Sequence, residues 1–316
     1  MTRGAWLFRQ PWLAALTALI VLSVVSVALQ PSFLRPDVLQ SNLTTFLPLV
    51  LVAIGQTYVV LAGDIDLSVG STVALVNVVA VSVMAAAGAG PGAVAAGLMA
   101  GAATGAACGL VNGALVALLR LQPVVATFAT SIVFSGLALW VLPQAGLPAP
   151  EPYWRGYGGD ALGVPTVMWV LGASVLVTAV VVRRPFMNQL LAAGGNRTAA
   201  FQTGLRLSAL RMAAFVICGL FAAAAALCLV GETASGDPLL GQSLSLSAIS
   251  AVVLGGTALA GGSGSAFGSS LVALLLGLIG NVIFFAGLPF AYQTLAQGLI
   301  ILAALAGGVL IARRPA

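Results

Sequence analysis

Charged side chains are scarce in this sequence. Of its 316 residues only 6% are charged and 60% are hydrophobic, and the mean hydropathy is +1.13. A soluble globular domain carries about 25% charged residues, so the composition excludes that class of protein. Long apolar runs are typical of membrane-spanning helices. We therefore predict an all-α integral membrane protein that forms a single transmembrane domain over residues 1–316.

Histidine and lysine are absent, and there are only three cysteines. Cys108, Cys218 and Cys228 lie within apolar stretches and show neither a zinc-type spacing nor a disulfide framework, so we interpret them as small packing residues. Acidic side chains are the only general acid–base groups left, and most of them lie in the predicted loops. We expect no catalytic site, no metal site and no cofactor bound by this chain.

The twelve basic residues are all arginines and outnumber the seven acidic residues. A nucleic-acid surface needs basic runs or basic–aromatic patches, and the sequence has neither, so we predict no nucleic-acid partner. Arginines flanking membrane spans favour the cytoplasmic side of a bilayer instead. The excess positive charge therefore indicates how the chain is oriented.

Charge-free intervals between the ionisable residues hold about ten helices, at about 20 residues per crossing. An even number of spans with both termini in the cytoplasm leaves only Arg35 and Arg155 outside. The arginines then predicted to be cytoplasmic are Arg3, Arg9, Arg120, Arg183, Arg184, Arg197, Arg206, Arg211, Arg313 and Arg314. The predicted spans are 12–29, 43–62, 67–87, 93–118, 124–142, 165–182, 212–231, 247–261, 268–286 and 291–311.

Two longer polar segments separate the predicted spans. Residues 143–164 are rich in proline and predict an outer, lid-like loop. Residues 183–211 contain five arginines and no acidic residue, and predict two short cytoplasmic helices that follow Pro185 and are separated by the Gly-Gly-Asn turn at 194–196. Two interpretations remain open for this inner segment: a solvated positive loop, or a docking surface for a soluble partner.

Two carboxylates, Asp64 and Asp66, lie between two apolar spans and have glycines on both sides. Acidic side chains at a membrane edge are energetically costly, and suggest a transport pathway or an anchor at the start of a helix. Asp66 and Ser68 predict a cap for the helix that follows, because a carboxylate there accepts hydrogen bonds from free backbone N–H groups. Contact with a substrate and a role in gating are the alternatives.

A short internal echo links two parts of the chain. Residues 61–63 and 70–71 read Leu-Ala-Gly and Gly-Ser, as do residues 259–261 and 268–269. The echo is either a chance result of composition or a trace of the repeats with interrupted helices that many transporters contain. The glycine-rich stretch around the second copy has no Gly-Lys-Ser/Thr, which excludes a nucleotide-binding loop and favours close helix packing or a helix break.

Several segments spread in order along nearly the whole chain have the character of family signatures. They are residues 55–71, 109–113, 126–127, 193–204, 251–262, 292–293 and 298–302. In this order they resemble the ribose-type permeases of bacterial ABC importers, which carry monosaccharides and related small polar molecules such as autoinducer-2. The chain departs from that family's usual residues at Asp64 (usually Gly), at Arg197 (often acidic) and at Gln297 (often Lys).

The resemblance implies a permease subunit in the bacterial inner membrane that hydrolyses nothing itself and works by alternating access. It also implies a second permease subunit forming a homodimer, two cytoplasmic ATPase domains that bind ATP and Mg, and a periplasmic substrate-binding protein. The segment at 183–211 corresponds to the family's coupling loop, and Arg197 indicates an ATPase with a complementary acid. The residues predicted to couple to the ATPase are Arg184, Gly194, Gly195, Asn196 and Arg197.

Polar side chains within or beside the spans are candidates for the translocation pathway, because amides and hydroxyls suit sugar hydroxyls. They are equally suited to hydrogen bonds between helices. The candidates for the pathway or its gating are Gln56, Asp64, Asp66, Ser68, Asn77, Asn112, Thr127 and Asn281. The competing functions are an ion-coupled secondary transporter that uses Asp64 and Asp66, and a structural protein of the membrane.

Overall fold

The computed structural model describes residues 11–88 and 90–287, together with positions 292, 295, 298, 299 and 302. Arg3, Arg9, Arg313 and Arg314 lie outside these residues, as does most of the last predicted span, 291–311.

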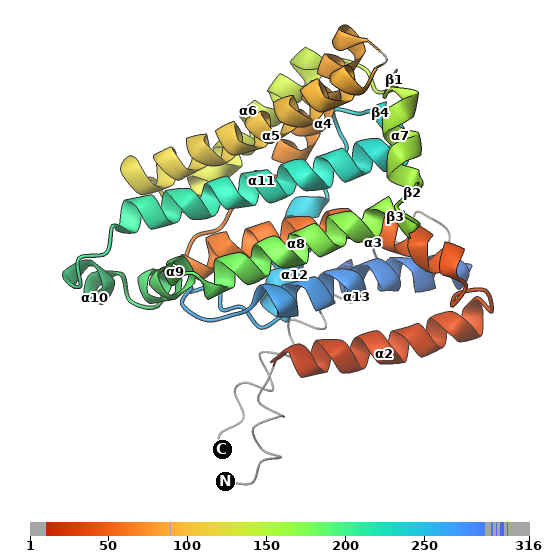
Figure 1. Cartoon of the computed structure of the whole chain (residues 1–316). Helices are drawn as coiled ribbons and strands as arrows, with labels where there is room; N and C mark the ends of the chain where they lie inside the picture. Colours follow the sequence, from red (N-terminus) through yellow and green to blue (C-terminus); the bar gives the residue numbers. More distant parts are fainter. Residues whose placement is uncertain are drawn as a thin grey trace.

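Helices make up most of the described part of the chain (Figure 1). In order they are α2 (Pro11–Leu29), α3 (Pro36–Leu61), α4 (Val69–Ala87), α5 (Pro91–Gly113) with a π-helical turn η1 (Ala114–Leu118), α6 (Pro123–Val141), α7 (Glu151–Gly158), α8 (Thr166–Arg183), α9 (Pro185–Gly195), α10 (Arg197–Gln202), α11 (Leu207–Thr233), α12 (Leu244–Leu254) and α13 (Ala266–Phe285). The prediction of an all-α membrane protein is confirmed.

Seven of the described helices are long and apolar enough to cross a membrane: α3, α4, α5 with η1, α6, α8, α11 and α13. Shorter apolar helices cover Ala15–Leu29 and Leu244–Leu254. Together these nine occupy the first nine predicted spans, with shifted ends. The start of α3 is corrected from residue 43 to Pro36, a proline at the first helical position, where its missing N–H is not needed.

The predicted eighth span, 247–261, is wrong in length. Helix α12 has 11 residues and ends at Leu254, which gives it a length of roughly 16 Å, against about 30 Å for a bilayer core. The chain then turns through four glycines with positive φ, at Gly256, Gly261, Gly262 and Gly264. The glycine-rich segment is therefore a helix break, as one of the two interpretations of its sequence predicts.

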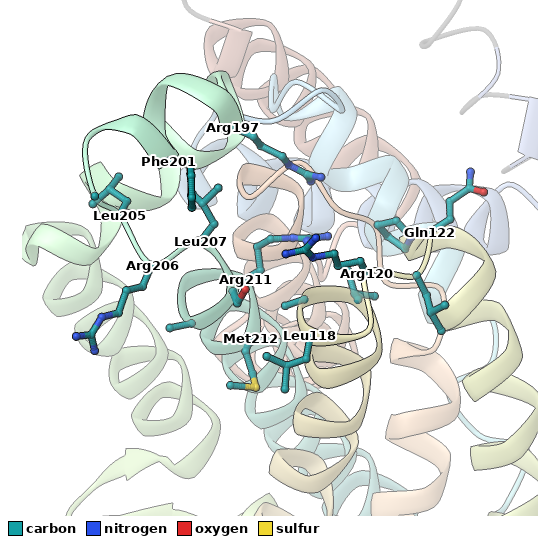
Figure 2. Close-up of a pocket in the computed structure, with 17 residues that line it drawn as sticks. Leu118, Arg120, Gln122, Arg197, Phe201, Leu205, Arg206, Leu207, Arg211 and Met212 are labelled. Carbon is teal, nitrogen blue, oxygen red and sulfur yellow. The ribbon is translucent and has the colours of Figure 1, made fainter.

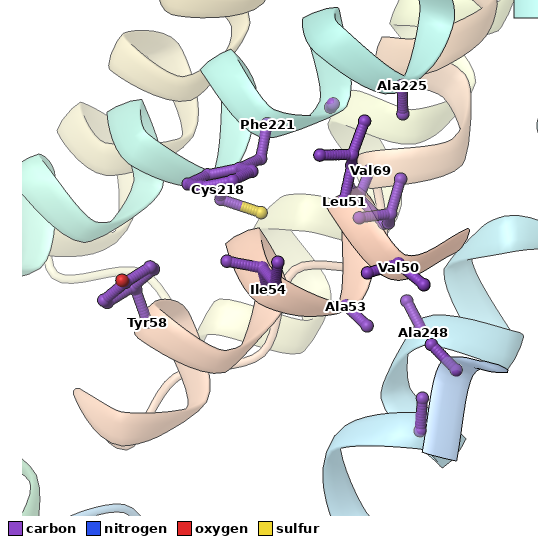
Figure 3. Packing of buried hydrophobic residues seen from close by; sticks show 14 of the residues in the cluster. Val50, Leu51, Ala53, Ile54, Tyr58, Val69, Cys218, Phe221, Ala225 and Ala248 are labelled. Atoms are coloured by element: carbon purple, nitrogen blue, oxygen red, sulfur yellow. The ribbon is translucent and has the colours of Figure 1, made fainter. Parts of the chain in front are cut away.

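Helix α3 lies at the centre of the core. Every residue from Leu47 to Leu61 is buried, which is typical of a helix that is apolar on all sides and surrounded by other helices. Figure 3 shows its side chains packed against those of α11 and α12, and the rings of Tyr58 and Phe221 stack with centroids 6.4 Å apart. The three cysteines are free and buried, which agrees with a packing role.

Glycines bring α5 and α11 into close contact. A methyl group added to Gly105 or Gly109 would overlap the backbone of α11, and one added to Gly219 would overlap the carbonyl of Gly105. Small residues at a crossing allow two helix backbones to approach and to pack without voids. The two helices therefore form one tightly packed pair through the middle of the bundle.

Short elements lie at the two ends of the bundle. Figure 1 shows α9 and α10 at one end, and α7 at the other. The predicted outer loop, 143–164, contains α7 and is anchored by strand β1 (Leu147–Pro148), which pairs with β4 (Ser235–Gly236) after α11. Strand β2 (Asp160–Ala161) pairs with β3 (Val164–Pro165). The predicted inner and outer loops thus lie at opposite ends.

Candidate functional site

A buried polar cluster joins the connection between α3 and α4 to helices α5 and α6. One carboxylate oxygen of Asp66 accepts hydrogen bonds from the backbone N–H of Ser68 at 2.8 Å and from its hydroxyl at 2.7 Å. The Asn112 amide donates to the Ser68 hydroxyl at 2.6 Å, and its carbonyl accepts from Thr130 at 2.6 Å. Thr127 accepts from the backbone N–H of Leu67 at 3.1 Å. Asn112 therefore connects three separate segments.

The predicted capping role of Asp66 is corrected in detail. Ser68 is the residue at the N-cap position of α4, and its side chain makes no cap hydrogen bond. Asp66 lies two residues before it and accepts the Ser68 N–H rather than an N–H of the first helical turn. The carboxylate therefore orders the connection that leads into α4.

Asn112→Ala is expected to destabilise the protein by about 1–3 kcal/mol, because it removes one hydrogen bond from each of the buried hydroxyls of Ser68 and Thr130. The free energy of unfolding of purified protein measures this effect. Ser131→Ala is the matched control, since the exposed Ser131 hydroxyl donates only to the carbonyl of Phe128, within the same helix. Equal stabilities for the two variants would contradict the connecting role of Asn112.

A second cluster places Asp64 between two arginines. The Asp64 carboxylate is fully buried and accepts a bidentate pair of bonds from Arg211, at 2.7 and 2.8 Å, and a third bond from Arg197 at 2.8 Å. Arg197 also donates to the carbonyl of Gly63 at 2.9 Å. Charge-assisted and bidentate bonds of this kind are the strong ones. The cluster ties α10 and α11 directly to the end of α3.

Glycines form a junction beside this cluster. The backbone N–H of Gly262 donates to the carbonyl of Leu61 at 3.0 Å. A methyl group added to Gly194 would overlap that same carbonyl and lie 2.6 Å from the Gly262 nitrogen. One added to Gly261 would lie 2.7 Å from the backbone of Gly63. The two segments that share the Leu-Ala-Gly sequence therefore touch, and the end of α9 lies against both.

The other residues predicted for ATPase coupling define the ends of α9 and α10. Arg184 is the N-cap residue of α9, and Gly195 is its last residue. Asn196 is the N-cap residue of α10, where its side chain accepts a hydrogen bond from the backbone N–H of Ala199 at 3.0 Å. The predicted pair of short helices is thus confirmed.

The remaining predicted pathway residues lie apart from these clusters. Gln56 is fully buried, and its Nε2 has no hydrogen-bond partner among the described residues. Asn77 accepts from the backbone N–H of Asp237 at 2.8 Å. Asn281 donates to Asn42 at 2.7 Å. The structure therefore brings together Asp66, Ser68, Asn112 and Thr127 and does not bring these three to them.

A mostly apolar groove that the sequence did not reveal lies between α4, α6 and α12. Its volume is about 660 Å³, and its polar side chains are Ser71, Ser131, Ser135, Gln242 and Ser245. Single serines in apolar helices are ordinary, so nothing marked them in advance. The i, i+4 spacing of Ser131 and Ser135, which places both on one face of α6, is the only signal that could have revealed the groove.

The acidic residues of the two clusters are engaged by neighbouring groups of the chain. Within the part of the chain that the structure describes, no group of three or more histidine, cysteine, aspartate or glutamate residues is placed to hold a metal ion. Asp64 and Asp66 accept only hydrogen bonds and ion pairs from neighbouring side chains and backbone. The Asp64 cluster and the glycines beside it can act mechanically, since they link the short helices α9 and α10 to the ends of the spanning helices.

Comparison with known proteins gives a consistent result. The family described as branched-chain amino acid transport system / permease component matches residues 38–305. The ribose import permease RbsC of Escherichia coli K12 is 34% identical over 95% of this chain and 93% of its own length, and that of Bacillus subtilis is 35% identical over 90% and 89%. The L-arabinose permease AraH of Azospirillum brasilense is 32% identical over 87% and 80%. No solved structure matches. With most of its length matched, the chain belongs to this family of transport-system permease components.

Proposed function

We propose that this permease carries a monosaccharide across the bacterial inner membrane, with both of its termini in the cytoplasm. Sugar permeases among its relatives support this substrate class, because they match most of the chain at 32–35% identity. A related permease named for autoinducer-2 import, LsrD of Escherichia coli, is 30% identical over 95% of the chain. We therefore propose a substrate class that includes related small polar molecules such as autoinducer-2 beside the monosaccharides.

A permease component is the membrane subunit of its transport system and is not an enzyme, since a partner ATPase hydrolyses ATP. The ABC importers that contain permeases of this family also include an ATPase and a substrate-binding protein. For this chain we propose a homodimer of permease subunits, two cytoplasmic ATPase domains and a periplasmic binding protein. ATP and Mg then bind to the ATPase, and this chain binds no cofactor.

The contact between α9–α10 and the ends of the spanning helices carries the proposed mechanism. Asp64 links the connection after α3 to Arg197 and Arg211, and Gly194 lies against Leu61 and Gly262. A movement of α9 and α10 imposed by the ATPase would therefore act directly on the connections after α3 and α12. Alternating access requires such a link between the two states of the pathway.

The groove between α4, α6 and α12 supplies a proposed surface for the solute, with a few hydroxyls on mostly apolar walls. Hydroxyls of Ser131 and Ser135 line it beside the apolar and exposed side chains of Phe128, Ile132 and Leu246. We propose that the second permease subunit closes this groove and that the solute passes between the two. Asp66, Ser68, Asn112 and Thr127 would then form a hydrogen-bonded layer that supports the groove from the side of the bundle core.

Ser135→Trp is expected to lower ATP-dependent sugar uptake at least tenfold, because the indole fills the groove between α6 and α12. Uptake of radiolabelled ribose and arabinose into proteoliposomes, with the ATPase and binding protein present, measures this effect. Val175→Trp is the matched control, since Val175 is an exposed side chain of α8 outside the groove. Normal uptake by Ser135→Trp would contradict the proposed pathway. Uptake that is independent of ATP but is lost when the ion gradient is removed would instead indicate the secondary transporter that uses Asp64 and Asp66.

A further inference from the structure

A large cavity opens at the end of the bundle that holds α10. Its volume is about 1030 Å³, and it is lined by η1 and the residues after it, by the start of α6, and by residues 197–212 (Figure 2). The volume is close to the upper end of the range for ligand pockets, about 300–1,000 Å³. We call this cavity the arginine pocket, because Arg120, Arg197, Arg206 and Arg211 line it.

The positive charge of the arginine pocket exceeds what the single carboxylate beside it, Asp64, can neutralise. Figure 2 shows the guanidinium groups of Arg120, Arg197 and Arg211 directed toward one another, whereas Arg206 points away. Asp64 pairs with Arg197 and Arg211 together, so one negative charge faces two positive charges. Among the described residues, no salt bridge includes Arg120. The pocket therefore has a net positive charge and at least one arginine without an acidic partner.

The backbone at Arg120 is held in an unusual conformation. Its φ is 56°, in the left-handed region that favours glycine. The backbone N–H of Leu121 donates to the carbonyl of Leu115 at 3.1 Å, across the end of the π-helical turn. Glycine is the usual residue at such a helix end, so the arginine here comes at a conformational cost. Compared with glycine, arginine at this position lowers the stability of the protein and places a guanidinium group in the pocket.

The remaining walls are apolar and lie where spanning helices end. Leu118, Leu121 and Phe201 line the pocket and are exposed. The span Pro91–Leu118 ends here, and the spans Pro123–Val141 and Leu207–Thr233 begin here. The pocket therefore lies at the level where a bilayer's hydrocarbon meets its head groups. A molecule that fits both parts has an anionic head and apolar chains.

We propose that the arginine pocket binds the phosphate group of an anionic phospholipid of the surrounding bilayer. A guanidinium group can donate two parallel hydrogen bonds to a phosphate group. Basic pockets between spanning helices bind the anionic head groups of lipids. The exposed leucines and Phe201 would lie beside the acyl chains. A free phosphate ion also carries a negatively charged phosphate group but would make no apolar contact with these walls. The arginine pocket shares no lining residue with the groove between α4, α6 and α12. A bound phosphate would compete with Asp64 for Arg197.

The test uses the purified full chain in a neutral detergent and three probes: dioctanoyl phosphatidylglycerol, dioctanoyl phosphatidylcholine and inorganic phosphate. Thermophoresis measures each dissociation constant. We expect phosphatidylglycerol to bind at least tenfold more tightly than either other probe. Arg120→Gln should lose roughly tenfold in affinity for phosphatidylglycerol, Arg120→Lys should lose less, and Arg183→Gln, an exposed arginine outside the pocket, should be unchanged.

Arg120→Gly separates binding from folding. Glycine suits the positive φ at this position, so the unfolding midpoint should be unchanged or higher while the preference for phosphatidylglycerol is lost. Equal binding of phosphatidylglycerol and phosphatidylcholine would overturn the proposal, and equal binding of inorganic phosphate would assign the pocket to a free ion. Variants that retain the lipid preference but lose association with the ATPase would show that the pocket receives an acidic protein surface instead.

Discussion

Gly194→Ala is expected to abolish ATP-driven transport and to lower the stability of the protein. The added methyl group would overlap the carbonyl of Leu61 and lie 2.6 Å from the nitrogen of Gly262. Both clashing atoms belong to the backbone, so the clash cannot be relieved by a change of side-chain rotamer. Overpacking of this kind costs about 1–3 kcal/mol, and here it would also displace α9 from the ends of the spanning helices. Uptake in proteoliposomes and thermal unfolding measure the two effects.

The neighbouring glycine provides the control. A methyl group on Gly195 would meet only the Cα of Gly262, at 3.7 Å, which is an ordinary contact. Gly195→Ala should therefore keep most of the transport activity. Gly172→Ala in α8, where nothing lies within 4 Å of the added group, should keep all of it. Similar losses in Gly194→Ala and Gly195→Ala would show that the junction does not depend on close backbone contact.

Asp64→Gly is expected to destabilise the protein by about 3–5 kcal/mol and to abolish transport. It would leave Arg211, whose side chain is only 12% exposed, and Arg197 without the carboxylate that neutralises them. Glycine is nevertheless the usual residue of the ribose-type permeases that the sequence resembles. Thermal unfolding and proteoliposome uptake again measure the outcome. Asp160→Asn is the control, because Asp160 is exposed and in no salt bridge of the described chain.

The two arginines should differ in a defined order. Arg211→Met should cost more stability than Arg197→Met, because Arg211 is the more buried side chain and makes two bonds to the carboxylate. If Asp64 were a solvated charge at the inner mouth, Asp64→Gly would leave both stability and uptake unchanged. That result would contradict the ion cluster that the structure shows.

Hydropathy and proline positions could predict most of the fold. The described spanning helices all overlap predicted spans, because about 20 apolar residues between charges leave few alternatives. The errors lie at helix ends. The predicted start at residue 43 overlooked Pro36, which occupies the first position of α3, as Pro91 and Pro123 do in α5 and α6. A proline at a helix start is a local signal that hydropathy does not contain.

The clusters could be predicted only in part. Asp64, Asp66, Asn112 and Arg197 were selected by type and by resemblance, but nothing local indicates that Asp64 faces Arg197, 133 residues away, and Arg211. Such a pairing depends on how α3 and α11 pack, which no single segment encodes. The same holds for the groove between α4, α6 and α12, whose serines are unremarkable within each helix.

The close packing of α5 against α11 has a consequence for how movement spreads. Helix α11 follows α10 after a short turn and has 27 residues, so it is roughly 40 Å long. Glycines hold it against α5 near its middle, and β4 follows its far end. A stiff rod that is held at its centre transmits a tilt from one end to the other. A displacement at Arg211 is therefore expected to reappear, in the opposite sense, beside the short ribbon of β1 and β4 at the other end of the bundle.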